Sequence, residues 1–332
     1  MHKKSSRLRW VLSLGVAATI VQPFPSIEPL REQSAVSHSA VAELPPWDGD
    51  RAGDRVMVQV TMPANASANA TAISTQDAII FNRLMQQAID QKFYQLPMGE
   101  RMQAIAQQFI GFSYQGDLLD QSSQETLKIS LQQFDCVLFV ETVLAMARGI
   151  SRQDYSIKTF VDSIQEQRYV NGEINGYCSR LHYFSEWILH NQKQGTITDL
   201  TPSLSGVPLH KTLNFMSSNW QKYPQLAHNS ANRKCIAEME ANLDSTSLRY
   251  IPHSQIRSQY AALKPGDIVA IATDIPGLDV THTGLVYRSS QGKVGLIHAA
   301  PKRGVIVSSD LAHYVGRVDR AIGILVARPV GN

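Results

Sequence analysis

Apolar residues recur at helical spacing through the first half of the chain. In 77–91, Ile80, Leu84 and Ala88 are four residues apart, so they fall on one face of a helix. The same periodicity predicts helices over 99–110, 154–167 and 183–190. The segment from Cys136 to Ala147 is largely apolar and contains no Gly or Pro, which predicts a buried helix with Cys136 in its first turn.

The pattern changes after Lys264. Short alternating or β-branched segments are separated there by turn residues, which predicts strands. The predicted strands cover 266–272, 281–288, 293–299, 304–308 and 321–327. Helices followed by an antiparallel sheet are typical of the α+β class.

The N-terminal residues have a leader pattern. Basic residues between His2 and Arg9 precede an uncharged, largely apolar stretch from Trp10 to Val21, which is too short for a comfortable membrane span. We expect a signal peptide over 1–25, export to the periplasm or the cell exterior, and no stable membrane insertion after cleavage. An uncleaved anchor is the alternative. Residues 26–75 are rich in Pro, Ser and Ala without periodicity, which predicts a disordered spacer.

The composition suits an enzyme of moderate size. The 332 residues are 43% hydrophobic and 18% charged, which is enough for a sizeable core in one domain, with or without an insertion. The formal net charge is +3, and no Lys/Arg cluster with interleaved aromatic residues occurs beyond the N-terminus. These features argue against nucleic-acid binding.

Cys136 is the first candidate for chemistry. The acidic Asp135 gives way to the apolar helix at this cysteine. Unpaired N–H groups and the positive end of a helix dipole favour a thiolate, so Cys136 is a candidate nucleophile. The alternative is a small core residue, the usual role of a lone helical cysteine.

Two histidines on predicted strands complete the candidate set. His282 and His298 flank a turn-rich quartet, Ser289–Gly292, that predicts a hairpin. Each is eight residues from Ser290, so we expect them roughly opposite one another on the same face. One imidazole would serve as base for Cys136 and the other would orient it.

A metal site is the competing interpretation of the same residues. Zinc accepts Cys and His ligands tetrahedrally. The chain contains no Cys-x-x-Cys and no His-Glu-x-x-His motif. We therefore expect neither a metal nor another cofactor.

Several ordered segments carry a family resemblance. From about Asp77 to Pro329 the chain resembles the NlpC-type cysteine amidases of the papain-like fold, and within them the N-acetylmuramoyl-L-alanine amidases. The matching segments are the two histidine strands together with Gly111–Leu118, Phe134–Glu141, Gly176–Tyr183, Asn214–Ser217, Tyr250–Pro252 and Lys264–Val269. The resemblance implies an amidase domain over 76–331, with N-terminal helices packed on an antiparallel, barrel-like sheet. Residues 172–223 would be an insertion forming a lid or wall.

The resemblance also implies an activity and a set of roles. The substrate would be peptidoglycan or muropeptides, cut between N-acetylmuramic acid and L-Ala, with Cys136 as nucleophile, His282 as base and His298 as orienting residue. A stem-peptide endopeptidase and a non-catalytic peptidoglycan-binding module are the alternatives. The Cys136 N–H would bind the oxyanion, together with the Tyr114 hydroxyl unless Tyr114 is a core aromatic.

Arg180, His182 and Tyr183 form a further polar cluster. We expect Arg180 to pair with a substrate carboxylate and Tyr183 to pack on substrate. The alternative is a helix N-terminus with solvated charges. Cys178 and Cys235 would form a disulfide, leaving Cys136 free, or both would be buried thiols.

Overall fold

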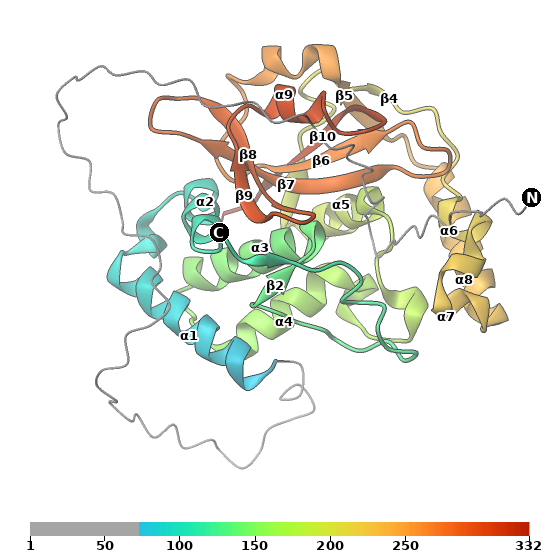
Figure 1. The fold of residues 1–332 in the computed structure, drawn as a ribbon, viewed down its shortest axis with the longest axis horizontal. Coiled ribbons are helices and arrows are strands. Elements are labelled where there is room, and N and C mark those ends of the chain that lie inside the picture. Colours follow the sequence, from blue (N-terminus) through green and yellow to red (C-terminus); the bar gives the residue numbers. More distant parts are fainter. Residues whose placement is uncertain (1–72, 332) are drawn as a thin grey trace, which may run out of the picture. The chain divides into compact units, whose positions relative to one another are not determined.

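The computed structural model describes residues 73–331 of the chain, shown as coloured ribbon in Figure 1. The longer helices in this part are α1 (Thr75–Asp90), α2 (Met98–Gln107), α3 (Cys136–Ser151), α4 (Ile157–Arg168), α5 (Phe184–Lys193) and α8 (Ser230–Asp244). The short ones are α6 (Phe215–Ser218), α7 (Pro224–Ala227) and α9 (Leu311–Val315). Every predicted helix is confirmed, with ends shifted by at most four residues, whereas α8 and the short helices were not predicted.

The strands fall into two groups. β1 (Ser113–Tyr114) and β2 (Gln133–Phe134) form a small parallel pair. The main sheet contains β3 (Ile197–Asp199), β4 (Val207–Pro208), β5 (Arg249–Pro252), β6 (Ile268–Thr273), β7 (Val280–Arg288), β8 (Val294–Ala300), β9 (Gly304–Ser308) and β10 (Ala321–Pro329). The five strands predicted after Lys264 are therefore confirmed.

The main sheet is antiparallel and open. Its order is β4-β5-β10-β6-β7-β8-β9, and β3 pairs with the far end of β10. In the described part of the chain β4 does not pair with β9, so the sheet is not closed. The predicted α+β class is confirmed, and the predicted barrel-like closure is wrong.

Both faces of the sheet are buried because its central strands are apolar at consecutive positions. In β6, Ile268 and Ala270 pack into the larger core with the helices, while Val269 and Ile271 pack into a second core on the opposite face. Figure 1 shows α3 below the sheet and α9 above it. Helix α3 is buried nearly all round, as a helix enclosed by other elements must be.

Part of the stretch 172–223, which is predicted to be an insertion, packs with the main body. Helix α5 packs in the larger core through Phe184, Trp187 and Ile188, and β3 belongs to the main sheet. A third, smaller core lies under the segments that follow, with Leu213, Met216, Tyr223, Leu226, Ile236 and Leu243 among its members.

The turn between β8 and β9 fixes the position of β1. The Val305 N–H donates to Phe112 O at 2.8 Å, and the Gly111 N–H donates to Val305 O at 2.9 Å. Gly304 has φ +73°, and a Cβ built there would lie 2.1 Å from Phe112 O. Only glycine permits this approach. It brings Tyr114, two residues on, to the same side of the sheet as α3.

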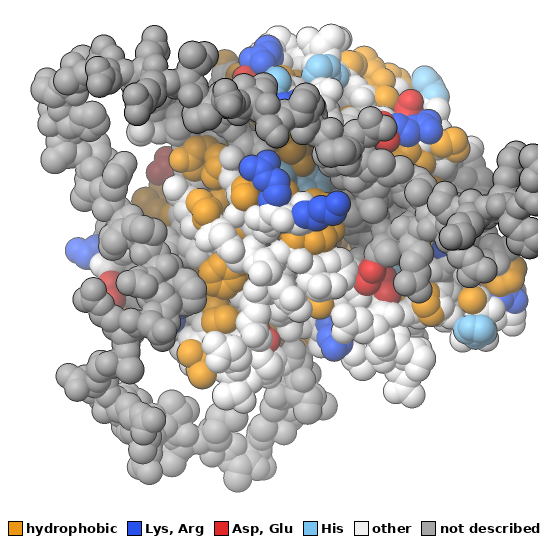
Figure 2. Space-filling model, viewed as in Figure 1, with side chains coloured by type: hydrophobic (Ala, Val, Ile, Leu, Met, Phe, Trp, Pro, Cys, Tyr) orange, Lys and Arg blue, Asp and Glu red, His pale blue; other side chains and the backbone are white. Residues whose placement is uncertain are grey.

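The predicted signal peptide, 1–25, and nearly all of the predicted spacer, 26–75, lie outside the described residues. Within 73–331, no helix is both long enough and apolar enough to cross a bilayer. On the face shown in Figure 2, the visible charged side chains occur singly or in small groups among apolar ones.

Candidate active site

Cys136 is the first residue of α3, and Asp135 caps that helix. The Asp135 carboxylate accepts hydrogen bonds from the N–H groups of Val137 at 2.9 Å and Leu138 at 2.7 Å. Such a cap satisfies two of the unpaired donors of a first helical turn. Cys136 is fully buried and is the one cysteine outside a disulfide.

The electrostatic environment of Cys136 differs from the expected one. Burial and the neighbouring Asp135 charge raise the pKa of the Cys136 thiol to about 12. Burial also raises the pKa of Asp135, to about 7. Because Asp135 occupies the N–H groups expected to favour a thiolate, the resting sulfur is a thiol. This direction of the pKa shift is opposite to the one expected for a helix-stabilised thiolate.

His282 and His298 lie on the neighbouring strands β7 and β8, but not directly opposite. The pairs Leu285–Ile297 and Val286–Leu296 set a register in which His298 faces Gly284. A Cβ on Gly284 would lie 2.8 Å from the Cβ of His298. The turn is thus centred one residue later than predicted. Both side chains still share a face, because a two-residue offset preserves the side of the sheet.

The two histidine rings are in contact, as predicted. His282 Nε2 and His298 Nδ1 are 2.7 Å apart, and one proton lies between them. A β-bulge helps to aim His282: its partner on β6 is Ile271, while the next residue, Ala272, pairs with Val280 and leaves Thr281 as the extra residue. Burial lowers the pKa of His282 to about 4, and that of His298 well below its usual value. Both rings are therefore neutral at pH 7.

Cys136 and His282 line one narrow pocket. Its volume is about 10 Å³, which is room for roughly one water molecule. The lining also includes Val137, His182, Phe184, Leu278, Asp279, Val280 and Thr283. The Thr283 hydroxyl donates to Cys136 O at 2.8 Å, which ties the start of α3 to β7. A thiol and a neutral imidazole in one enclosed pocket are suited to nucleophilic catalysis with a general base.

Two tyrosines approach this pocket from different elements. Tyr114 lies on β1, and burial together with the nearby Cys136 and Asp135 raises its pKa. Tyr314 lies on α9, with its ring centroid 4.5 Å from that of His298 and 6.1 Å from that of His282. Burial and Cys136 also raise the pKa of Tyr314. Tyr314 was not predicted as a site residue, because the short helix that carries it has no periodic pattern in the sequence.

Comparison with known proteins gives this site a family. Residues 104–324 match the AmiA-like family, described as N-acetylmuramoyl-L-alanine amidase-like. The chain belongs to this amidase-like family. The match contains Tyr114, Cys136, His282, His298 and Tyr314, so every group described above lies inside the family region.

Several solved structures are similar to this chain. An N-acetylmuramoyl-L-alanine amidase from Bacteroides uniformis is 32% identical, with a TM-score of 0.66 over 70% of this chain and 99% of that one. A candidate xylanase from Bacteroides fragilis is also 32% identical, with a TM-score of 0.63 over 67% and 98% of the two chains. A Legionella pneumophila protein at 18% identity shares the fold, with a TM-score of 0.60 over 79% and 97%. No curated protein matched.

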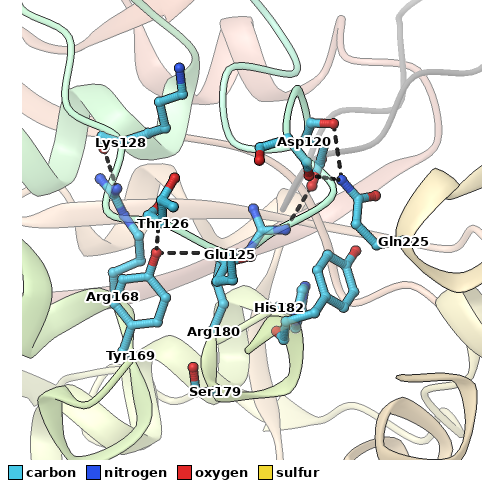
Figure 3. Close-up of polar contacts among 12 residues, drawn as sticks. Asp120, Glu125, Thr126, Lys128, Arg168, Tyr169, Ser179, Arg180, His182 and Gln225 are labelled. Atoms are coloured by element: carbon cyan, nitrogen blue, oxygen red, sulfur yellow. Dashed lines mark hydrogen bonds and ion pairs between the residues drawn. The ribbon is translucent and has the colours of Figure 1, made fainter. Parts of the chain in front are cut away.

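Arg180 of this amidase-like chain is buried and paired with carboxylates of the chain itself. It is 2% exposed, and its guanidinium lies 2.6 Å from a carboxylate oxygen of Asp120 and 3.4 Å from one of Glu125 (Figure 3). The expected pairing with a substrate carboxylate stays a prediction, and such a carboxylate would have to compete with Asp120 and Glu125. The alternative of solvated charges at a helix N-terminus is wrong, because the group is buried.

The buried charges around Arg180 form a cluster that holds the segment before Cys136. Arg168 pairs with Glu141 of α3 at 2.7 Å and also donates to Lys128 O. The Tyr169 hydroxyl donates to Glu125 at 2.8 Å. Figure 3 shows these side chains reaching from α4 and its neighbouring loop to the 120–128 segment. That segment connects β1 with β2, so the cluster fixes the two strands that carry Tyr114 and lead to Cys136.

His182 and Tyr183 have different positions although they are adjacent. His182 lines the Cys136 pocket, and its Nε2 donates to Tyr177 O at 2.8 Å. Burial and the Arg180 charge hold its pKa well below the usual value. Tyr183 does not line that pocket. Its hydroxyl donates to Glu240 at 2.6 Å, and it packs in the third core. The expectation that Tyr183 packs on substrate is wrong, because it is buried in that core.

A disulfide joins Cys178 to Cys235, with their Cα atoms 6.2 Å apart. Of the two alternatives for these cysteines, the disulfide is the one confirmed. It connects the turn just before Arg180 and His182 to α8. Together with the Tyr183–Glu240 hydrogen bond, it fastens the third core to the pocket wall. Within 73–331, no group of three or more His, Cys, Asp and Glu side chains could hold a metal ion.

Proposed function

We propose that the protein hydrolyses the amide between N-acetylmuramic acid and L-Ala, in peptidoglycan or muropeptides, through a cysteine acyl-enzyme. The observation that carries this proposal is the pocket shared by Cys136 and His282, in a chain of the amidase-like family. The order of nucleophile helix and histidine strands supports a papain-like, NlpC-type active site. The leader pattern supports export to the compartment that contains peptidoglycan.

The first half of the reaction uses the neutral resting pair. His282 Nδ1 accepts the thiol proton as Cys136 Sγ attacks the lactyl carbonyl carbon. The oxyanion is met by the Cys136 N–H at the start of α3 and by the Tyr114 hydroxyl. One aligned donor of this kind lowers the barrier by about 2.7–4 kcal/mol. The carbon–nitrogen bond then breaks, and the His282 imidazolium gives its proton to the departing L-Ala nitrogen.

The second half regenerates the thiol. Water attacks the thioester while His282 accepts a proton from it. The carbon–sulfur bond breaks, the lactyl group leaves as a carboxylic acid, and the proton on His282 returns to Cys136 Sγ. His298 holds the His282 ring throughout, because the hydrogen bond between them fixes its orientation and tautomer.

The pocket lining disfavours a glycosidase. Glycosidases with two catalytic carboxyl groups place them on either side of the bond. Asp279 is the one carboxyl group in the lining, and it already accepts hydrogen bonds from the N–H groups of Ser185 and Val280. We therefore propose no sugar-bond cleavage.

Product analysis on one defined muropeptide tests the proposed function. Mass spectrometry after incubation with the full chain should show a free muramic-acid sugar and an intact stem peptide. A shortened peptide still attached to sugar would identify an endopeptidase. An unchanged muropeptide would identify a non-catalytic binding module. Activity should survive EDTA and be lost to iodoacetamide, and the reverse result would overturn the cysteine mechanism.

A further inference from the structure

The hydrogen-bond chain that starts at His282 does not end at His298. His298 Nε2 lies 3.1 Å from the hydroxyl oxygen of Ser308. Ser308 is the last residue of β9, two positions beyond Ile306, which pairs with His298. His282, His298 and Ser308 therefore form a continuous series across three neighbouring strands. Neither Ser308 nor His298 is in the pocket lining, so the link from Ser308 to the pocket runs through the two rings.

Two arrangements of protons fit this series. In the first, His282 Nε2–H donates to His298 Nδ1, and His298 Nε2–H donates to Ser308 Oγ. In the second, every donor and acceptor is exchanged, so His298 Nδ1–H donates to His282 Nε2 and the Ser308 hydroxyl donates to His298 Nε2. A neutral imidazole has one donor and one acceptor nitrogen. Only the first arrangement leaves His282 Nδ1 unprotonated and able to accept a proton from Cys136.

We propose that Ser308 is a positioning residue that keeps the first arrangement available by accepting a hydrogen bond from His298. This inference rests on the proposed function for its role in catalysis. The His298 ring is fully buried, so without Ser308 the first arrangement leaves a buried N–H donor with no acceptor. Without Ser308, the second arrangement leaves only the lone pair of His298 Nε2 without a donor. Buried N–H groups without a partner are rarer in proteins than under-satisfied acceptors, so the loss of Ser308 favours the inactive arrangement.

The chain offers well-matched variants for a test. Ser308→Thr keeps the hydroxyl, and Ser308→Val has nearly the same shape without it; a strand tolerates both β-branched residues. Ser309→Ala removes the neighbouring exposed serine of the same segment and serves as the control. Circular dichroism and thermal melting establish that each variant is folded.

Histidine-selective ¹⁵N NMR on the full chain reads the tautomers directly. The wild type, Ser308→Thr and Ser309→Ala should carry the proton of His282 and of His298 on Nε2. In Ser308→Val the protons should move to Nδ1 of both rings. Unchanged tautomers in a folded Ser308→Val protein would overturn the inference. This measurement needs no substrate, so it stands even if the protein cleaves no muropeptide.

Kinetics on a muropeptide give the second readout. Ser308→Val should lower kcat by about 10- to 100-fold with KM nearly unchanged, because the residue acts on the base and not on substrate binding. Ser308→Thr should restore most of the rate. Equal rates for the Thr and Val variants would contradict the assignment. A wild type that is inactive in this assay, with the expected tautomers, would overturn the proposed function and leave the Ser308 relay standing.

Discussion

His282 Nε2 and His298 Nδ1 lie 2.7 Å apart although the two residues are not cross-strand partners. The position opposite His298 is Gly284, and the missing side chain there leaves room for the His298 ring to reach diagonally toward His282. His282 also lines the Cys136 pocket, whereas His298 does not. The His282 ring therefore shares a pocket with Cys136, whereas the His298 ring is linked to that pocket only through its hydrogen bond with His282.

Substitutions of His282 and of His298 should therefore lower activity to different extents. His282→Ala should lower kcat/KM by about 10²–10⁴-fold, because no other group accepts and returns the proton. His298→Asn and His298→Gln should keep measurable activity, because a side-chain amide oxygen can still accept from His282. His298→Ala should fall between them. Steady-state kinetics on one muropeptide would reveal exchanged roles if His298→Asn were inactive and His282→Ala active.

The dependence of activity on pH should reflect a neutral resting pair. Burial lowers the pKa of His282 to about 4 and helps to raise that of Cys136 to about 12. His282 acts as a base only when it is unprotonated, so kcat/KM should fall as pH drops through about 4. Titration of His282 and Cys136 should leave kcat/KM level from pH 6 to 9. A bell-shaped profile with limbs near the usual His and Cys values would contradict it.

This profile needs a stability control at each pH. The unfolded chain has an ordinary histidine pKa, so below about 6.5 it binds a proton that the folded chain does not bind at His282. The free energy of unfolding therefore falls as pH drops from about 6.5 toward 4. Circular dichroism at each pH separates this loss of folded protein from loss of the base.

Asp135→Asn should make Cys136 more reactive. The amide oxygen of the new side chain can still accept hydrogen bonds from the N–H groups of Val137 and Leu138. The substitution removes the Asp135 charge, which helps to raise the pKa of the Cys136 thiol. Iodoacetamide should alkylate the variant faster at pH 8, roughly tenfold for each unit by which the pKa falls. Mass spectrometry reports one site, because Cys178 and Cys235 are bonded to each other. Equal rates in the two proteins would show that burial alone sets the pKa.

The Arg180 cluster should matter for folding and not for substrate affinity. Arg180→Met leaves Asp120 and Glu125 without their cation, and loss of one member of a buried pair costs about 3–5 kcal/mol. The matched control is Arg320→Met, whose pair with Asp274 is about half exposed and should contribute less than about 1 kcal/mol. Urea unfolding measures the loss of unfolding free energy in both variants. A stable Arg180→Met protein with a raised KM would instead support Arg180 as a substrate-binding residue.

The sequence was sufficient where local patterning decides the structure. Cys136 opens its helix because apolar residues follow a polar one, and the hairpin brings His282 and His298 to one face. The pairing register was missed by two residues, because four turn residues do not reveal which pair closes the hairpin. Burial of the pocket was also missed, since it depends on Phe184 and Leu278 from distant segments. That burial reverses the expected protonation of Cys136.

The remaining differences between the predicted and the observed site come from contacts between residues far apart in the sequence. Arg180 meets Asp120 and Glu125 across more than fifty residues, and no local signal indicates such a pair. Tyr314 reaches the histidines from a single short helix that has too few turns for periodicity. Ser308 was within reach of sequence reasoning, since it lies on the predicted strand next to that of His298. Its contact depends on the strand register, which the sequence left open.

Trapping of the acyl-enzyme tests the central claim most directly. The full chain is mixed with a defined muropeptide, quenched in acid within the first turnover, digested and analysed by mass spectrometry. The peptide that contains Cys136 should carry the muramic-acid acyl group and no stem-peptide residue, and Cys136→Ala, which is nearly isosteric and should fold normally, should give neither adduct nor products. Stem-peptide residues on Cys136, or a free sugar and an intact peptide released by folded Cys136→Ala, would contradict the account.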